Sequence, residues 1–316
     1  MPAPKWGAEP MRQQGRIFEI QHLALYDGPG VRTVVYLKGC PLKCVWCHNP
    51  EGQRIAPELL FHAEKCTGCG LCAAVCPAGA HAVSGGIHRL DHSLCVGCGR
   101  CVPSCIHAAL TIAGETVSVE AALREILCDR AFFRGEGGLT LSGGEPLMQS
   151  DFACALLAAA KEQGIHTCME TCGHAPEEAV REAAGVTDLF LYDIKELDTH
   201  RHKEMTGLGN ERILSNLMLL DSMGKRVILR CPVIPGQNMR KEHFMGVAAL
   251  AQRLPSVEAI ELEPYHPLGL SKYADLGRTP KFSNTEFLSA ASLSGYAEEM
   301  RKLTEKPIRL STGEDI

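Results

Sequence analysis

The pattern of apolar and polar positions along the chain predicts an α/β fold. Short runs of β-branched and apolar residues alternate with longer stretches of helical periodicity. The predicted strands are 33–37, 139–142, 165–170, 189–194, 226–233 and 257–264, and the predicted helices are 119–130, 151–163, 177–184, 211–223, 240–253 and 285–304. Strands that alternate with helices in this way form a parallel sheet with right-handed crossovers. Six such strands predict an open or partial (β/α)6 barrel.

Two of the predicted helices carry capping signals. Ser150 is the expected N-cap of the helix 151–163, and Gly164 is its expected C-terminal stop. Ser283 and Glu286 have the spacing of a capping box, which predicts that the last helix begins near residue 285. In barrels of this kind catalytic residues gather at the carboxyl ends of the strands, so candidate site residues are sought there.

Residues 54–115 interrupt the alternation of strands and helices. This segment is rich in Cys, Gly and Pro, and it contains two similar stretches, CTGCGLCAAVCP and CVGCGRCVPSCI, which begin 29 residues apart. The repeat is too short for a solenoid and predicts one small inserted domain. We therefore expect residues 16–53 and 116–316 to form the partial barrel and residues 54–115, the insert, to form a ferredoxin-like domain.

Composition adds two exclusions and one anomaly. The net charge of -5 argues against a surface that binds nucleic acid, and no apolar run approaches the roughly 20 residues that a membrane span needs. Residues 1–15 lack the apolar region of a signal peptide, so a cytoplasmic location is expected. The anomaly is the number of cysteines, 16 in 316 residues. Closely spaced cysteines in a reducing compartment hold metal more often than they form disulfides.

Eleven of these cysteines fall into three runs, and the other five lie in apolar surroundings. We expect the five to be core residues, although one of them, Cys172, adjoins a candidate site. They are Cys128, Cys154, Cys168, Cys172 and Cys231.

The two runs in the insert have the spacing C-x2-C-x2-C-x3-C of two-cluster ferredoxins. In that arrangement the fourth cysteine of each run ligates the other cluster. One predicted 4Fe–4S cluster is therefore held by Cys66, Cys69, Cys72 and Cys105, and the second by Cys76, Cys95, Cys98 and Cys101. Structural zinc is the alternative, but two zinc sites would not need this close spacing in both runs.

The first run supplies only three thiolates, from Cys40, Cys44 and Cys47. Three ligands leave one iron of a cubane open, as a catalytic metal requires. A zinc site completed by the adjacent His48 is the alternative.

This run, with Trp46 before its third cysteine, resembles the signature of the radical S-adenosylmethionine superfamily. The neighbouring motifs resemble, in order, those of glycyl-radical-enzyme activating enzymes of the larger type that carries a ferredoxin-like insert. The motifs are YDGPGVR (26–32), KGCP (38–41), WCHNPE (46–51), SGGEP (142–146), ETCG (170–173), DIK (193–195) and PYHPLG (264–269).

The resemblance implies an enzyme that cleaves S-adenosylmethionine reductively and removes a hydrogen from a glycine Cα of a partner enzyme. It implies three 4Fe–4S clusters, an anaerobic setting, and a low-potential electron donor such as flavodoxin or ferredoxin. The partner is expected to be a glycyl radical enzyme of the choline, isethionate or sulfonate, glycerol or arylacetate type, a lyase or dehydratase. The residues do not distinguish among these clients.

The resemblance also implies the residues of the site. Catalytic roles fall to the three cysteines of the first run and to Asp193 and Lys195, which share one face of a strand end. Asp27 is the residue expected to meet the glycyl loop of the partner. Glu170 and Thr171, with Asp193, occupy a position that can bind a monovalent cation. The implied cofactor contacts are Trp46, Cys47, His48, Gly143, Gly144, Glu145, Glu170, Thr171, Asp193, Ile194, Lys195, Arg230 and His266.

Three other functions are weighed against this one. A pure electron-transfer module would explain the insert but has no use for a three-cysteine cluster followed by GGEP, DIK and PYH motifs. A radical enzyme that acts on a small molecule or peptide would share the fold and the cofactor, so fold kinship alone does not exclude it. A metal-stabilised binding protein is the weakest alternative.

Overall fold

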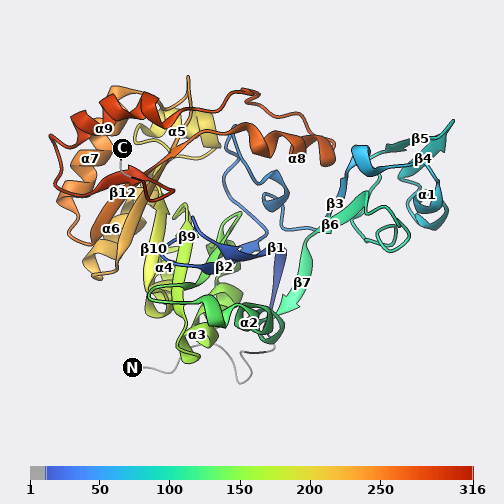
Figure 1. Ribbon diagram of the computed structural model, residues 1–316, viewed down its shortest axis with the longest axis horizontal. Coiled ribbons are helices and arrows are strands. Elements are labelled where there is room, and N and C mark those ends of the chain that lie inside the picture. The colour runs from blue at the N-terminus through green and yellow to red at the C-terminus, as the bar shows by residue number, and fades with distance from the viewer. Residues whose placement is uncertain (1–10, 12, 315) are drawn as a thin grey trace.

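The computed structural model describes residues 11, 13–314 and 316. Residues 1–10, on which most of the signal-peptide prediction rests, lie outside this part. The chain forms an α/β fold around a nine-stranded sheet of order β13-β12-β11-β10-β9-β8-β2-β1-β7 (Figure 1). Its strands are β1 (Gln14–Ala24), β2 (Arg32–Leu37), β7 (Glu115–Ser118), β8 (Gly138–Gly143), β9 (His166–Thr171), β10 (Leu189–Asp193), β11 (Val227–Val233), β12 (Val257–Pro264) and β13 (Ile308–Leu310).

The six predicted strands form the parallel centre of this sheet. Each of β2, β8, β9, β10, β11 and β12 pairs in parallel with the next, which confirms the α/β class. The three strands that were not predicted lie at the edges: β13 extends the sheet in parallel, while β1 and β7 are antiparallel. Most side chains of β1 are at least partly exposed, so its sequence lacks the continuous apolar run of a central strand.

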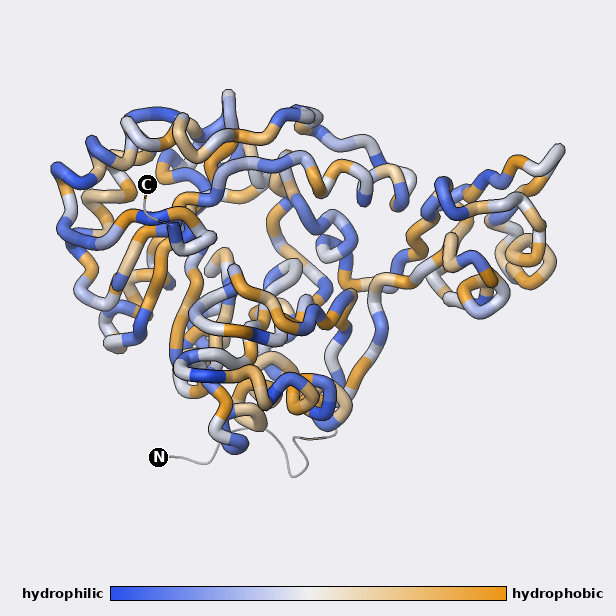
Figure 2. The backbone as a smooth tube through the Cα atoms, in the orientation of Figure 1, coloured by the Kyte–Doolittle hydropathy of each residue, from blue (hydrophilic) through white to orange (hydrophobic). Residues whose placement is uncertain are grey.

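Eight helices of the described chain lie outside the insert, and most of them bury one face against the sheet. They are α2 (Val119–Cys128), α3 (Ser150–Glu162), α4 (Glu177–Val186), α5 (Thr199–Thr206), α6 (Glu211–Ser222), α7 (Lys241–Arg253), α8 (Leu270–Asp275) and α9 (Ser294–Met300). Figure 2 shows hydrophobic stretches along the central strands, where one continuous core joins the sheet to α2, α3, α4, α6, α7 and α9. By contrast, α5 packs through Met205 beside Trp46, and α8 contacts β3 (Glu58–Phe61). None of the described helices has the length and apolarity needed to cross a membrane.

Two predicted helix starts were wrong. Ser150 is the first residue of α3 rather than its cap, because a 3-10 turn at Pro146–Gln149 runs directly into the helix. The predicted helix 285–304 is interrupted: a 3-10 turn at Ala290–Leu293 precedes the short α9, and Asn284 accepts a hydrogen bond from the amide of Glu286. That bond makes a local turn in place of the capping box. Gly164 follows α3 with φ +71°, as expected of a C-terminal stop.

The insert contains four short strands and one short helix. β3 (Glu58–Phe61) pairs with β6 (Leu110–Ala113), and β4 (His81–Ser84) pairs with β5 (Ile87–Leu90). In Figure 1, α1 (Leu71–Val75), β4 and β5 lie at the end of the insert that projects away from the main sheet. At the near end His62 bonds Asp275 of α8, and Arg278 pairs with Glu58.

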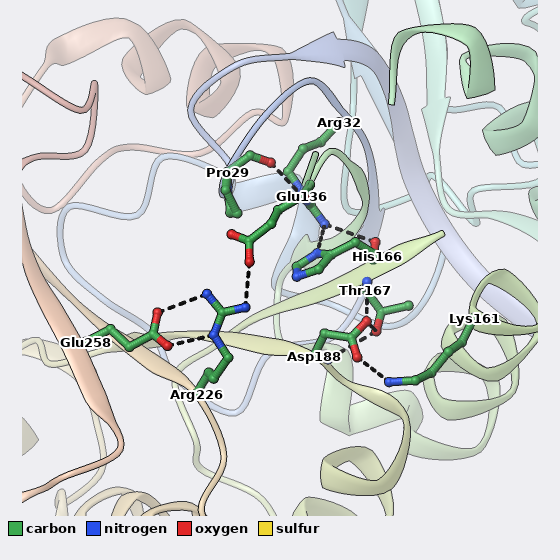
Figure 3. A network of polar contacts seen from close by, with 9 residues as sticks. All are labelled: Pro29, Arg32, Glu136, Lys161, His166, Thr167, Asp188, Arg226 and Glu258. Atoms are coloured by element: carbon green, nitrogen blue, oxygen red, sulfur yellow. Dashed lines mark hydrogen bonds and ion pairs between the residues drawn. The ribbon is translucent and has the colours of Figure 1, made fainter. Parts of the chain in front are cut away.

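A polar network ties together the amino ends of the central strands (Figure 3). Arg32 is fully buried at the start of β2 and donates to the carbonyls of Pro29, Glu136 and Leu139 at 2.6–2.9 Å. Nearby, Arg226 pairs with Glu136 and Glu258. Structural contacts therefore occupy the amino ends of the strands, and the carboxyl ends are left for a site.

Candidate active site

A cavity of about 420 Å³ opens at the carboxyl ends of the parallel strands. That is within the range of ligand pockets. Fourteen of the predicted site residues line it: Asp27, Cys40, Cys44, Trp46, Cys47, His48, Gly143, Gly144, Glu170, Thr171, Asp193, Lys195, Arg230 and His266. Glu145 and Ile194 are the two predicted contacts that do not line the cavity.

The loop that carries the first cysteine run is anchored at both sides. The amides of Lys43 and Val45 donate to the carbonyls of Thr206 and Met205 at 2.7 and 3.0 Å, and the amide of Cys40 donates to Gln53 at 3.0 Å. Trp46 is 6% exposed and packs beside Met205, Ile234 and Tyr265. The backbone of the loop is therefore fixed before any ligand binds.

The three thiols of this loop fit a bound metal cluster. Burial raises the pKa of Cys44 to about 12 and that of Cys47 to about 11. By contrast, a hydrogen bond from Cys172 lowers the pKa of Cys40. A buried thiolate needs a positive charge or a metal to stabilise it, so three thiols that converge on one cavity are suited to metal binding. With three sulfurs, the donor set leaves one iron of a 4Fe–4S cluster without a cysteine.

Gly143 and Gly144 end β8 where two backbones approach closely. Gly143 has φ +115°, and a Cβ on Gly144 would lie 2.3 Å from the carbonyl oxygen of Gly39 and 2.5 Å from that of Gly52. Only glycine fits there without moving the backbone. The GG pair therefore sets the position of the cysteine loop against the sheet and also exposes backbone to the cavity.

Asp193, the last residue of β10, and Lys195, two residues further on, form a mostly buried ion pair. Lys195 Nζ lies 2.8 Å from Asp193 Oδ2, and each side chain is 14% exposed. Burial opposes the charge on Lys195, but Asp193 and the Cys44 sulfur raise the pKa of that ammonium well above its ordinary value. Asn238 donates to the carbonyl of Lys195 at 2.8 Å and fixes the chain that follows. The pair presents both charges to the cavity.

Arg230, in the middle of β11 and in register with Asp193 at the end of β10, is the centre of a buried network of carboxylates. Its guanidinium lies 3.1 Å from Glu170, 3.1 Å from Glu261 and 3.5 Å from Glu263. Burial, with Asp193 and Glu170 nearby, raises the pKa of Glu263 to about 8 despite the opposing effect of Arg230. Burial and Glu170 likewise raise the pKa of Asp27 to about 6. A second guanidinium, that of Arg309, lies 2.9 Å from Glu261, and the two arginines together face four acidic groups.

The residues of the predicted cation site already have partners. Glu170 accepts from Arg230 and from the hydroxyl of Ser142. The hydroxyl of Thr171 donates to Glu145 at 2.7 Å.

Glu145 itself is completely buried behind the cavity. Its carboxylate accepts from Thr171, from the amide of Cys172 at 2.8 Å and from the amide of Leu147 at 3.0 Å. Its observed position is therefore that of a brace between β8 and the end of β9. A motif reading alone does not show which way such a side chain points.

Two imidazoles stack at the cavity wall. The rings of His48 and His266 have centroids 4.1 Å apart and planes inclined by 17°. Burial lowers the pKa of His48 to about 4 and also lowers that of His266. Among the described residues, His48 Nε2 and His266 Nδ1 are buried without a hydrogen-bond partner, so both are available to a ligand.

Several cavity residues were not predicted from the sequence as site residues, among them Cys172 and Glu263. Cys172 is 5% exposed, and its thiol hydrogen-bonds to the sulfur of Cys40. Cys172 follows the predicted strand 165–170, and Glu263 lies near the end of the predicted strand 257–264. Their position near strand ends was the signal that could have identified them as site residues. Of the five remaining cysteines, four are buried as expected, whereas Cys128 is exposed because it lies on the outer face of α2.

The insert contains two smaller hollows lined by cysteine. The first hollow brings together Cys66, Cys69, Cys72 and Cys105. The second hollow brings together Cys76, Cys95, Cys98 and Cys101. Each set takes three cysteines from one run and the fourth from the other, which is the grouping expected from the spacing.

Comparison with known proteins places the chain in a family. Residues 34–248 match the Radical SAM superfamily. A choline trimethylamine-lyase activating enzyme of Oleidesulfovibrio alaskensis is 43% identical over 299 residues, 92% of this chain and 96% of that relative. A (2S)-3-sulfopropanediol sulfolyase activating enzyme of Bilophila wadsworthia is 45% identical over 273 residues, 84% of this chain and 90% of that relative.

Among solved structures, Streptococcus suis SuiB bound to the precursor peptide SuiA shares the fold. It has a TM-score of 0.56 at 13% identity and covers 92% of this chain and 49% of that chain. The chain therefore belongs to the radical SAM superfamily. It is an enzyme, and its relatives are activating enzymes of glycyl radical enzymes, which confirms the function predicted from the sequence. Family membership implies a 4Fe–4S cluster and S-adenosylmethionine as cofactors.

Proposed function

We propose that the cavity holds S-adenosylmethionine beside a 4Fe–4S cluster and that the enzyme forms a glycyl radical on a partner lyase or dehydratase. The observation that carries this proposal is the convergence of three buried thiols, the Asp193–Lys195 pair and two unpartnered imidazoles on one cavity. When bound, the two cofactors supply a 5′-deoxyadenosyl radical that removes hydrogen from a glycine Cα.

Each set of cavity residues is assigned to a different part of the two cofactors. Cys40, Cys44 and Cys47 would hold the cluster, and the iron without a cysteine ligand would be free to bind S-adenosylmethionine. Gly143 and Gly144 bring backbone groups close to the ammonium of that ligand, since neither carries a side chain. We assign the cofactor's remaining polar contacts to Asp193, Lys195, Arg230 and the end of β9.

Three residues at the cavity wall suit the adenine ring. His48 and His266 offer free ring nitrogens, and Trp46 borders the same cavity. An aromatic wall with hydrogen-bonding edges can both stack on a base and orient it. Trp46 also packs in the core, so a purely structural role for its ring stays open.

The cavity mouth is suited to a protein substrate. Tyr26 and Asp27 line the cavity, and Tyr26 is 56% exposed. Leu25, the residue before them, is 59% exposed. We assign Asp27 to contact with the glycyl loop of the partner. An exposed apolar rim next to a polar recess favours a docked loop over a freely diffusing small molecule.

The insert is proposed to be a ferredoxin-like domain, residues 54–115, inserted in a partial (β/α)6 barrel formed by residues 16–53 and 116–316. Within the described part of the chain its four strands pair only with one another. We propose that the two hollows hold two 4Fe–4S clusters, which makes three in total. The insert can then accept electrons from a low-potential donor such as flavodoxin or ferredoxin, or it can brace the partner. A cytoplasmic location, where thiols stay reduced, accords with this.

A monovalent cation at Glu170, Thr171 and Asp193 stays a prediction. Both carboxylate oxygens of Glu170 already accept hydrogen bonds, and the Thr171 hydroxyl is engaged with Glu145. A dependence of cofactor affinity on K⁺ in place of a larger organic cation would support the cation.

An isotope-transfer assay tests the proposal. The reduced enzyme is mixed anaerobically with S-adenosylmethionine and each candidate partner, which has been labelled with deuterium at glycine Cα. The true client is expected to transfer deuterium to 5′-deoxyadenosine, and the Cys44→Ser enzyme, as the control, to form no such product. Unlabelled 5′-deoxyadenosine with every candidate would instead support the small-molecule or peptide substrate.

A further inference from the structure

Two histidines lie between the two hollows of the insert. His88, on β5, borders the first hollow, and His81, on β4, borders the second. The two rings are joined by a hydrogen bond of 2.9 Å between His81 Nδ1 and His88 Nε2. No motif that we used to identify the function includes either residue.

His88 is directed at the sulfurs of the first hollow. Its Nδ1 lies 3.5 Å from Cys66 Sγ, and its Nε2 lies 3.7 Å from Cys72 Sγ. The ring of Phe61 packs edge-on against it with centroids 4.4 Å apart. Packing and the bond to His81 therefore fix the orientation of this imidazole.

One tautomer of His88 satisfies both the contact with Cys66 and the bond to His81. A cysteine that ligates iron has no S–H, so its sulfur can only accept a hydrogen bond. His88 therefore satisfies Cys66 only if its proton is on Nδ1, which leaves Nε2 bare to accept from His81 Nδ1–H. The partner of the second ring nitrogen commonly sets the tautomer of a histidine at a metal site.

The two hollows differ in this respect. Backbone amides donate to a sulfur in each: Ala109 to Cys105 in the first at 3.2 Å, and Ala80 to Cys76 in the second at 3.3 Å. Among the described residues, only the first hollow has imidazole nitrogens within hydrogen-bonding distance of cysteine sulfurs. Hydrogen bonds to the sulfurs stabilise the reduced, more negative cluster and raise its reduction potential.

We propose that His88, held in its Nδ1–H tautomer by His81, donates a hydrogen bond to the Cys66 ligand of the first cluster and makes it easier to reduce than the second. His88 is a positioning residue toward the cluster, and His81 acts through it. This inference rests on the two insert clusters proposed above. It adds that the two clusters are inequivalent, although the cysteine repeat that binds them is symmetric.

A redox titration followed by EPR tests the inference on the full chain. The Cys40→Ala/Cys44→Ala/Cys47→Ala background removes the first-run cluster, so that only the insert signals are observed. We expect two separate reduction steps. In His88→Ala the more positive step shifts to lower potential by about a tenfold change in the reduced-to-oxidised ratio, roughly 59 mV for one electron. The other step stays in place.

Three matched variants separate hydrogen bonding from general disturbance. His88→Asn keeps an N–H near the Nδ1 position and is expected to restore most of the potential. His81→Ala is expected to shift the same step in the wild-type insert but not in the His88→Ala insert, since it acts through His88. His107, an exposed histidine that lines the same hollow, serves as the control, and His107→Ala is expected to leave both steps unchanged.

The outcomes distinguish the inference from the proposal beneath it. Fewer than about eight irons per chain in the reconstituted background protein would contradict the two insert clusters themselves. Two fully loaded clusters with equal potentials, or a His88→Ala titration that matches the parent, would overturn the role of His88. If His88→Ala does not take up its clusters, the reduced parent protein is labelled with ¹⁵N-histidine, and weak nitrogen couplings to the cluster are sought by EPR methods. Their presence would support the hydrogen bond from His88 to Cys66, and their absence would contradict it.

Discussion

Arg230 Nη1 and Glu170 Oε1 lie 3.1 Å apart although they belong to strands that do not touch. Arg230 is in β11, Glu170 is in β9, and β10 runs between them in parallel with both. The pair therefore spans the end of β10, next to Asp193. Parallel strands align their carboxyl ends, and this alignment turns motifs about 30 residues apart into one cavity.

Removal of Arg230 should destabilise the fold strongly. Its side chain is 4% exposed and faces Glu170, Glu261 and Glu263. Arg230→Met removes the cation beside Glu170 and leaves Glu261 with Arg309 alone, which is expected to lower the free energy of unfolding by about 3–5 kcal/mol. Urea denaturation measures the change. The control is Arg226→Met, whose two carboxylate partners are about as exposed as it is, and it should cost under about 1 kcal/mol.

Stability should fall with rising pH because of Glu263. Its pKa is raised from 4.5 to about 8 in the folded protein, so between these values the folded state keeps a proton that the unfolded state has lost. Stability that depends on that proton is therefore lost as the pH rises through this window. Glu263→Gln cannot ionise, so its stability relative to wild type should increase from pH 5 to pH 8. A difference that stays constant over this range would show that Glu263 is already charged when folded.

Iron content should show whether the first cysteine run holds a cluster of its own. The wild type is expected to bind about twelve irons per chain, and Cys44→Ser about eight, because one cubane is lost. Cys128→Ser changes an exposed cysteine outside the runs and should retain the full number. Iron and sulfide assays after anaerobic reconstitution measure both. A Cys44→Ser protein with unchanged iron would remove the first run from the cluster ligands.

The GG pair should tolerate no side chain. A Cβ at Gly144 would lie 2.3 Å from the carbonyl oxygen of Gly39, so Gly144→Ala must displace the segment that leads into Cys40. We expect at least a tenfold loss of S-adenosylmethionine affinity, measured by calorimetry on the reconstituted protein. Gly185→Ala, in α4, meets nothing within 4 Å and should leave affinity unchanged while it stabilises the helix by up to about 1 kcal/mol.

Local patterns predicted much of the fold and most of the cavity. Apolar runs located all six central strands, and motifs near these strands located fourteen cavity residues. Most of those motifs follow the carboxyl end of a strand, whereas Asp27 precedes β2 and Arg230 lies within β11. Cysteine spacing alone paired the two sets in the insert. Strand β1, which lies between β2 and β7, was missed because most of its side chains are polar or partly exposed, and a local Asn284 turn outweighed the capping box expected at Ser283.

Features that depend on the final tertiary structure could not be predicted in this way. Glu145 turns away from the cavity because its carboxylate accepts hydrogen bonds from the Thr171 hydroxyl at the end of β9 and from the amide of Cys172, which follows that strand. The contact of Cys172 with Cys40 joins residues 132 positions apart, and no local rule connects them. The His81–His88 bond likewise depends on the register of the β4–β5 hairpin.

The most direct test of the central claim is anaerobic EPR of the reduced, iron-reconstituted enzyme with S-adenosylmethionine and a panel of candidate glycyl radical enzymes. The account predicts a glycyl doublet with one type of partner, and its loss in Cys44→Ala while Cys128→Ala retains it. The same experiment would identify the client. Accumulation of 5′-deoxyadenosine without a doublet in any partner would contradict the assignment of a protein glycine as the substrate.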